Sequence, residues 1–122
     1  MTGADRYHRQ RLTHIGDDGQ EAICNSHVAI VGVGALGCMS ADMLARAGVG
    51  TITLIDRDIV EFTNLQRQVL FTEQDAETHQ PKATAAASRI NAINSSIEIR
   101  PHVEDLSQKN VDRLLKDADI II

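Results

Sequence analysis

The chain has 122 residues, of which 43% are hydrophobic and 24% charged, a composition typical of one soluble globular domain and not of a disordered or fibrous chain. Twelve Lys and Arg against 17 Asp and Glu leave a formal net charge of -5 without a basic cluster, which argues against a nucleic-acid surface. The N-terminus carries no apolar run for a signal peptide or membrane anchor, and two cysteines far apart in the sequence favour a reducing compartment, so we expect a cytoplasmic protein.

The first strong structural signal is a strand, a helix and a strand in succession. Residues 1–26 come before it and predict an N-terminal helical arm, because their apolar positions are scattered among polar ones. The apolar run Val28–Val31 predicts a buried strand, and Thr51–Ile55 predicts another. Between them, the apolar spacing over Leu36–Ala47 predicts a helix that stops at Gly48. A crossover helix between two such strands implies that the strands are parallel.

The middle of the chain loses this periodicity. From Asp56 to Gln80 the sequence is irregular, far beyond the usual connection of about 4–6 residues, and such a length suggests a functional loop. Pro81 then opens a predicted helix with one apolar stripe. The stripe consists of Ala83, Ala86, Ala87, Ile90 and Ile93. Because it is mostly alanine, we expect close packing.

The last part of the chain predicts two more strands and a short helix. Ile97, Ile99 and Val103 outline a third strand that is interrupted by Pro101, so this strand should be short or lie at an edge of the sheet. Ser107 is expected to cap a helix. That helix carries Val111, Leu114 and Leu115 on one side. Residues 120–122 are all isoleucine and predict a fourth strand, with no turn or cap after it, so we expect the chain to be cut in mid-strand.

Together these elements predict an α/β fold, a Rossmann-like parallel sheet with flanking helices that is truncated after about the fourth strand. The predicted organisation is a helical arm over residues 1–26 and an incomplete nucleotide-binding domain over residues 27–122.

A glycine-rich turn follows the first predicted strand directly and opens the helix after it. The segment Gly32-Val33-Gly34-Ala35-Leu36-Gly37 has the G-x-G-x-x-G pattern. In this pattern Gly32 permits a tight turn, Gly34 lets backbone amides approach a phosphate, and Gly37 allows close packing of helix and strand. Asp56 ends the next strand, at the position where an acid binds a ribose hydroxyl. The sequence therefore predicts a nucleotide site, for which NAD is the default ligand.

The irregular loop carries residues that suit a polyphosphate better than a nicotinamide. It contains Asn64, Arg67 and Gln68, and Lys82 stands just inside the next helix. Arg binds phosphate with a planar fork and Lys binds it as a point charge, whereas hydride transfer needs no such cluster. The alternative is that Arg67 and Lys82 are ordinary solvated surface charges.

Cys38 opens the helix after the glycine turn. A helix N-terminus there would lower the pKa of a thiol, but a small buried core residue is the simpler interpretation.

Six segments in this order closely resemble the ThiF/MoeB/HesA family, the prokaryotic relatives of ubiquitin-activating enzymes. They are Arg6-Tyr7-His8-Arg9-Gln10, the turn Gly32 to Gly37, Ala47-Gly48-Val49-Gly50, Leu54-Ile55-Asp56-Arg57-Asp58, Asn64-Leu65-Gln66-Arg67-Gln68 and Gln80-Pro81-Lys82. The resemblance runs from about Arg6 to the end of the chain. It implies an ATP-dependent adenylyltransferase that activates the C-terminal glycine carboxylate of a ubiquitin-like sulfur-carrier protein, with magnesium, and releases pyrophosphate.

The resemblance also implies roles for single positions. Backbone amides around Gly34 would lie near the nucleotide, Asp56 would bind the ribose, and Arg9 would reach into the ATP site of the other subunit of a homodimer. The implied catalytic residues are Arg9, Arg67 and Lys82. The implied nucleotide-binding residues are Gly32, Gly34, Ala35, Leu36, Gly37, Asp56, Asp58, Asn64, Arg67, Gln68 and Lys82.

Some features of that family are expected beyond residue 122, namely the magnesium-binding Asp and the cysteines of its zinc site. We therefore expect no metal ligand within this chain and little activity from these residues alone. Two other functions remain open at this point: an NAD-binding Rossmann oxidoreductase, and a nucleotide-binding or dimerisation module without catalysis.

Overall fold

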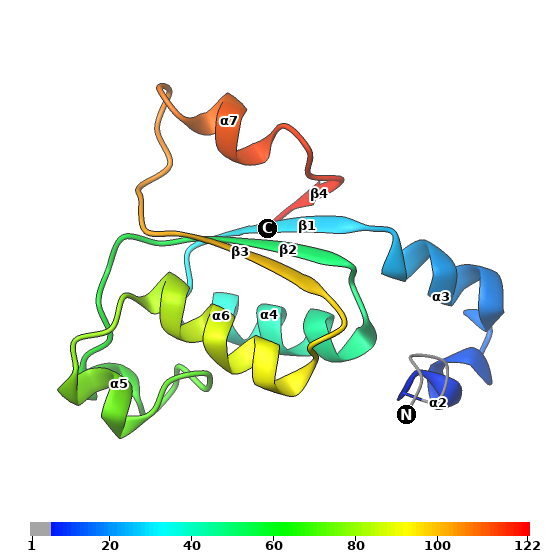
Figure 1. The fold of residues 1–122 in the computed structure, drawn as a ribbon, viewed down its shortest axis with the longest axis horizontal. Coiled ribbons are helices and arrows are strands. Elements are labelled where there is room, and N and C mark those ends of the chain that lie inside the picture. Colours follow the sequence, from blue (N-terminus) through cyan, green and yellow to red (C-terminus); the bar gives the residue numbers. More distant parts are fainter. Residues whose placement is uncertain (1–5) are drawn as a thin grey trace.

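A four-stranded parallel sheet lies at the centre of the computed structural model, which describes residues 6–122 (Figure 1). Its strands are β1 (His27–Val31), β2 (Thr51–Ile55), β3 (Glu98–His102) and β4 (Ile120–Ile121). Their order across the sheet is β3-β2-β1-β4, and every neighbouring pair is parallel. The predicted α/β fold and its parallel strands are thereby confirmed.

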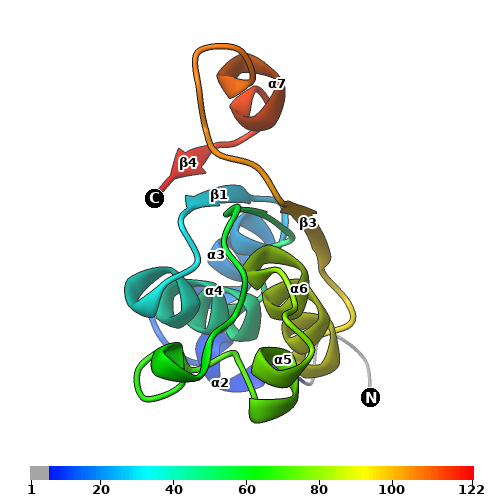
Figure 2. The same cartoon turned by 90° about the vertical axis from the view of Figure 1, so that its left-hand side faces the viewer.

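The helices lie on both sides of this sheet. Figures 1 and 2 show α4 (Ala35–Ala47) and α6 (Lys82–Ile93) against one face and α7 (Val111–Leu115) on the opposite side. The smaller elements are α2 (His8–Arg11), α3 (Gly16–Cys24), the 3-10 helix η1 (Phe62–Asn64) and α5 (Glu73–Glu77). The first five residues of the predicted arm lie outside the described part of the chain. No helix within residues 6–122 has both the length and the apolar character needed to cross a bilayer.

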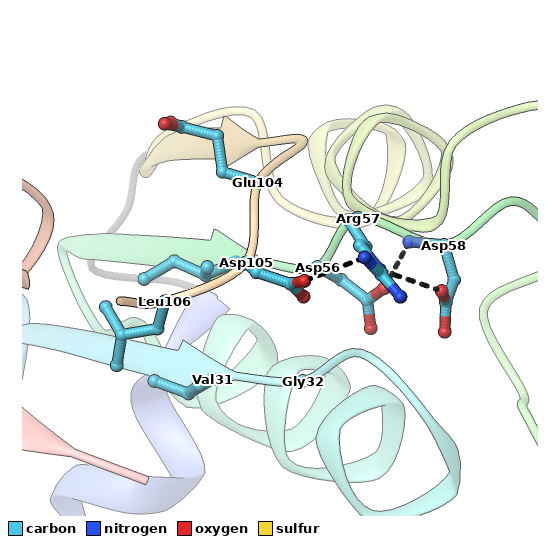
Figure 3. A pocket seen from close by; sticks show the side chains of 9 residues that line it. Val31, Gly32, Asp56, Arg57, Asp58, Glu104, Asp105 and Leu106 are labelled. Carbon is cyan, nitrogen blue, oxygen red and sulfur yellow. Dashed lines mark hydrogen bonds and ion pairs between the residues drawn. The ribbon is translucent and has the colours of Figure 1, made fainter. Parts of the chain in front are cut away.

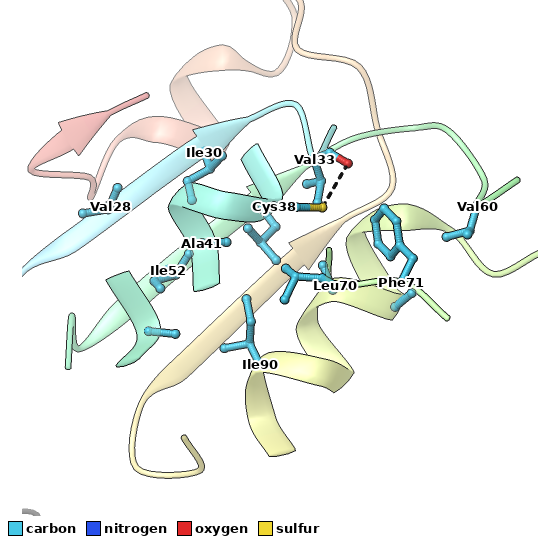
Figure 4. Close-up of a cluster of buried hydrophobic side chains, with 14 of the residues drawn as sticks. Val28, Ile30, Val33, Cys38, Ala41, Ile52, Val60, Leu70, Phe71 and Ile90 are labelled. Atoms are coloured by element: carbon cyan, nitrogen blue, oxygen red, sulfur yellow. Dashed lines mark hydrogen bonds between the residues drawn. The ribbon is translucent and has the colours of Figure 1, made fainter. Parts of the chain in front are cut away.

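The core lies between the sheet and the pair α4 and α6 (Figure 4). Large side chains come from the strands, such as Ile30 and Ile52, whereas α4 contributes Ala41 and Ala45, all at most 1% exposed. Small residues let the helix lie close to the strands, since no long side chain holds the two backbones apart. On α6, the predicted alanine stripe is buried in large part, which confirms close packing there.

The helix α4 was predicted correctly, but its buried face was not. Leu36, Met39 and Met43, whose spacing indicated the helix, are 86%, 47% and 63% exposed. The buried residues of α4 are Gly37, Cys38, Ala41 and Ala45. The face of α4 that packs on the sheet has room only for small side chains, so the larger apolar side chains lie on the other face of the helix.

Two further predictions need correction. The stretch from Asp56 to Gln80 is not wholly irregular, because it contains η1 and α5, and α5 begins with a capping box between Thr72 and Asp75. Ser107 does not cap α7, whose N-cap is Asn110. Instead the Ser107 hydroxyl accepts from the Lys109 amide, in a turn that precedes the helix.

The N-terminal arm is fixed to the body of the fold by Asn94, which is fully buried. The Asn94 Nδ2 donates to the Tyr7 hydroxyl at 2.9 Å and to the Ala45 carbonyl at 2.8 Å. The Tyr7 ring lies over Gly48, which ends α4 in a left-handed conformation with φ of 94°. Asn94 therefore joins the arm to the C-terminal end of α4.

Replacing Asn94 should destabilise the fold. The change Asn94→Ala removes the buried partner of the Tyr7 hydroxyl and one of the two donors to the Ala45 carbonyl, which keeps the Gly48 amide, so we expect a loss of about 1–3 kcal/mol in the free energy of unfolding, measured by urea denaturation. Asn91→Ala, on the exposed side of the same helix, is the matched control and should change this free energy by less than about 0.5 kcal/mol. Equal effects of the two variants would show that the buried amide does not join the arm.

Cys38 should be an inert thiol. It is fully buried, its Sγ donates to the Val33 carbonyl at 3.8 Å, and burial raises the pKa of this thiol above its usual value. Because the thiolate is the reactive form, Cys38 should not react with Ellman's reagent in the native protein. The partly exposed Cys24 should react first, so the Cys24→Ser variant should show no labelling until it is unfolded. Rapid native labelling of that variant would contradict the buried position.

Candidate nucleotide-binding site

The glycine turn connects β1 to α4 at the carboxyl end of the sheet. Gly32 has a φ of 98°, which side chains with a Cβ rarely adopt. Gly34 is the N-cap residue of α4. A Cβ on Gly37 would collide with the carbonyl oxygen of Gly32, so a side chain there would push α4 away from the turn. The three glycines thus hold the first amides of a 13-residue helix at the end of β1.

Asp56 joins this turn to the loop after β2 (Figure 3). One carboxylate oxygen accepts from the Val33 amide at 2.8 Å, and the other accepts from the Asp58 amide at 2.8 Å. Each oxygen keeps acceptor capacity for a further donor, such as a ribose hydroxyl. The structure therefore brings Asp56 and the glycine turn together, as the sequence predicted.

A cavity of about 310 Å³ opens beside Asp56. Its lining residues are Val31, Gly32, Ile55, Asp56, Arg57, Asp58, Glu104, Asp105 and Leu106. Arg57 is 69% exposed and pairs with Asp105 at 3.1 Å (Figure 3). Residues 104–106 were not predicted from the sequence to belong to this site. Their position directly after β3 could have indicated it, because the carboxyl ends of parallel strands meet at the same edge of a sheet.

Lys82 is the most unusual charge of the site. It is only 8% exposed, and no carboxylate pairs with it among residues 6–122. It lines a second cavity, of about 290 Å³, together with Asp58, Ile59, Glu61 and Asn64. A nearly buried ammonium without a paired carboxylate is unfavourable, so Lys82 itself favours an anionic partner, whereas Asp58 and Glu61 add negative charge to the same cavity.

Asn64 and Gln68 are also nearly buried, at 8% and 4% exposure. The Asn64 Oδ1 accepts from the Glu61 amide at 2.8 Å, which holds its side chain in place. Gln68 lies next to the glycine turn, since a Cβ built on Gly34 would be 4.0 Å from the Gln68 Nε2. The Gln68 Oε1 is buried and has no hydrogen-bond partner. A buried acceptor of this kind requires a donor, and a bound ligand can supply one.

The other predicted positions are more exposed. The Arg67 side chain is exposed and its Nη1 donates to the Thr63 carbonyl at 3.1 Å. Ala35 and Leu36 form the first turn of α4, where a third cavity of about 450 Å³ is found. The Leu36 side chain is 86% exposed, so its contribution to the turn is its backbone amide.

Arg9 is not brought to the site of its own chain. It lies on α2, next to Gln10, whose Nε2 donates to the Ala47 carbonyl at the C-terminal end of α4. The glycine turn lies at the other end of that helix, about 20 Å away for 13 residues. The Arg9 side chain is exposed and has no hydrogen bond or ion pair with any residue that the structure describes.

No group of three or more His, Cys, Asp or Glu side chains within the described range is arranged to hold a metal ion.

Comparison with known proteins identifies related chains over the whole sequence. The chain is 47% identical to the sulfur carrier protein ThiS adenylyltransferase of Bacillus subtilis over 100% of its length, and covers 36% of that protein. It is 42% identical to the molybdopterin-synthase adenylyltransferase of Escherichia coli, with 96% of this chain and 47% of the relative covered. The chain therefore spans less than half the length of these relatives.

Solved structures with the same fold are also found. The crystal structure of PaaA superposes with a TM-score of 0.90 at 34% identity, over 99% of this chain and 41% of PaaA. The tRNA N6-threonylcarbamoyladenosine dehydratase of E. coli in complex with ATP gives a TM-score of 0.84 at 29% identity, over 93% of this chain and 45% of the enzyme. Residues 7–122 match the model of the ThiF family, and with the glycine turn, Asp56 and Lys82 placed around one end of the sheet, the chain belongs to that family.

Proposed function

We propose that this chain is the ATP-binding part of an adenylyltransferase that activates the C-terminal glycine carboxylate of a ubiquitin-like sulfur-carrier protein as an acyl-adenylate. The observation that carries this proposal is Lys82, a nearly buried cation without a carboxylate partner in the described chain, in a cavity beside the loop that follows Asp56. Relatives that are named as sulfur carrier protein adenylyltransferases support the reaction, and an ATP complex of a structural relative supports the ligand.

The residues present fit ATP better than NAD. The first amides of α4 and the positive end of its dipole suit phosphate, as do Lys82 and Arg67. Asp56 keeps acceptor capacity for the ribose hydroxyls, and the buried Gln68 Oε1 requires a hydrogen-bond donor. Asn64 and Asp58 line the cavity that contains Lys82. An NAD site has no need for two cations after the second strand.

ATP supplies the adenylyl group and pyrophosphate as the leaving group. The carrier carboxylate is ionised at neutral pH, so this chain needs no general base to activate it. Attack on the α-phosphorus forms one carboxylate O–P bond and breaks the bond to pyrophosphate. Lys82 and Arg67 would stabilise the negative charge that moves onto the departing phosphates, because fixed cations need no reorganisation as the charge develops.

We also propose that the protein is a cytoplasmic homodimer in which Arg9 serves the ATP site of the second copy. This assignment is supported by the exposure of Arg9 and by its distance from the glycine turn of its own chain. In the proposed organisation, residues 1–26 form the arm that carries Arg9, and residues 27–122 hold the nucleotide. Magnesium would be bound with ATP, with its Asp ligand beyond residue 122.

The ATP site can be tested by calorimetric titration with magnesium-ATP and, separately, with NAD. We expect ATP to bind and its affinity to fall about tenfold in both Lys82→Met and Arg67→Ala, because each loses a charge-assisted contact of about 1.4 kcal/mol. Methionine keeps the buried aliphatic volume of Lys82 without its charge. Lys109→Met and Arg89→Ala change exposed cations and should bind ATP as the unchanged protein does. Binding of NAD alone would overturn the proposal.

The role of Arg9 across the dimer can be tested by mixing variants. Arg9→Ala and Lys82→Met should each bind ATP weakly. When the two are mixed and allowed to exchange subunits, some dimers contain one site with Lys82 of one copy and Arg9 of the other. We therefore expect calorimetry of the mixture to recover a fraction of tight sites. A monomer in sedimentation, or no recovery from a mixture that has exchanged subunits, would contradict this assignment.

A further inference from the structure

The segment between β3 and β4 is held to the rest of the fold by few contacts. Its helix, α7, buries one residue, Leu114. The strand that follows has two register pairs with β1, Ile120 with Val28 and Ile121 with Ala29, and the flanking residues Asp119 and Ile122 add backbone hydrogen bonds to β1. Because this ladder is short, we expect side-chain contacts as well as strand pairing to fix the register of β4 against β1.

His27, the first residue of β1, makes four hydrogen bonds at this place. Its amide donates to the Asp119 carboxylate at 2.8 Å, and its carbonyl accepts from the Asp119 amide at 2.8 Å. Its ring is 2.9 Å from the Asp117 carbonyl through Nδ1 and 2.7 Å from the Thr53 hydroxyl through Nε2. A carbonyl oxygen can only accept, so Nδ1 carries a proton and donates to the Asp117 carbonyl, while Nε2 is the hydrogen-bond partner of the Thr53 hydroxyl. At 8% exposure, this ring joins β2 to the turn that precedes β4.

The other end of β4 reaches the glycine turn. The Ile122 amide donates to the Ala29 carbonyl at 2.9 Å, and the Ile122 carbonyl accepts from the Val31 amide at 2.9 Å. Ile122 lines the cavity of about 450 Å³ beside Gly32 and Gly34. A slip of β4 by one residue toward the amino end of β1 would withdraw the Ile122 side chain from this cavity, whereas a slip the other way would bring the isoleucine of position 121 to the same place.

We propose that His27 is a positioning residue for the nucleotide site, because its ring fixes the register of β4 from the amino end of the sheet and thereby places Ile122 beside the glycine turn. The part of this inference that concerns ATP rests on the proposed function. His27 does not touch that cavity.

The test compares His27→Ala with His27→Asn in the full chain. The asparagine Nδ2 takes the place of the histidine Nδ1 and can still donate to the Asp117 carbonyl, whereas alanine cannot. Amide hydrogen exchange is followed at Asp119, Ile122 and Val31, three amides whose partners depend on the register of β4. The Gly32 amide, which donates to the Ile55 carbonyl, reports on the unaffected β1–β2 pair.

We expect His27→Ala to speed exchange roughly tenfold at the three β4-dependent amides and not at Gly32, since a buried hydrogen-bond partner is lost. His27→Asn should restore most of the protection, and Thr53→Val, which removes only the Nε2 contact, should have an intermediate effect. His14→Asn changes an exposed histidine of the arm and is the matched control. Unchanged exchange in His27→Ala, or equal acceleration at Gly32, would overturn the proposal.

ATP affinity provides the second measurement. It should fall several-fold in His27→Ala and recover in His27→Asn, in parallel with the exchange rates. Faster exchange with unchanged ATP affinity would show that His27 fixes the strand without positioning the site, which also overturns the proposal. If the unchanged protein bound no ATP, the proposed function would fail, whereas the exchange rates would still decide whether His27 fixes β4.

Discussion

The contact between Gly37 and the carbonyl oxygen of Gly32 sets how closely α4 lies to the end of β1. No side chain fits between them, so the first turn of the helix is held against the strand, and its amides point beyond the end of the sheet. The carboxylate of Asp56 then fixes the same turn from the neighbouring strand by accepting from the Val33 amide. The remaining parts of the site, including Lys82 and Gln68, are arranged around this rigid point.

The carboxyl end and the amino end of the sheet carry different features. The carboxyl end carries the glycine turn and the cavities lined by Asp56 and Lys82, and the amino end carries the contacts that join the arm and β4 to the sheet. Asn94 and His27, at 0% and 8% exposure, are among the buried polar residues that make these contacts. Under the proposed role of His27, ligand binding at the carboxyl end depends on contacts made at the amino end.

Much of this arrangement could be predicted from the sequence because it follows from local rules. The strand Thr51–Ile55 was predicted to the residue, since a β-branched run between turns has few other structures available. The position of Asp56 followed from the end of that strand. The buried face of α4 could not be predicted, because the choice between small residues such as Ala41 and large ones such as Met43 is made by the distance to the sheet, which is a tertiary property. The burial of Lys82 and the convergence of residues 104–106 on the Asp56 cavity depend in the same way on the crossing of distant segments.

The two edges of the sheet also differ in their capacity to accept another strand. On β3, the Glu98 amide donates to the Gly50 carbonyl, and the His102 carbonyl accepts from the Asp56 amide, so the even-numbered residues bond inward to β2. The alternate residue Pro101 therefore faces outward, and it has no amide hydrogen to offer. Proline at this place hinders the pairing of another strand with β3, and so hinders edge-to-edge aggregation of the sheet. A strand added to this sheet would pair more readily beside β4 than beside β3.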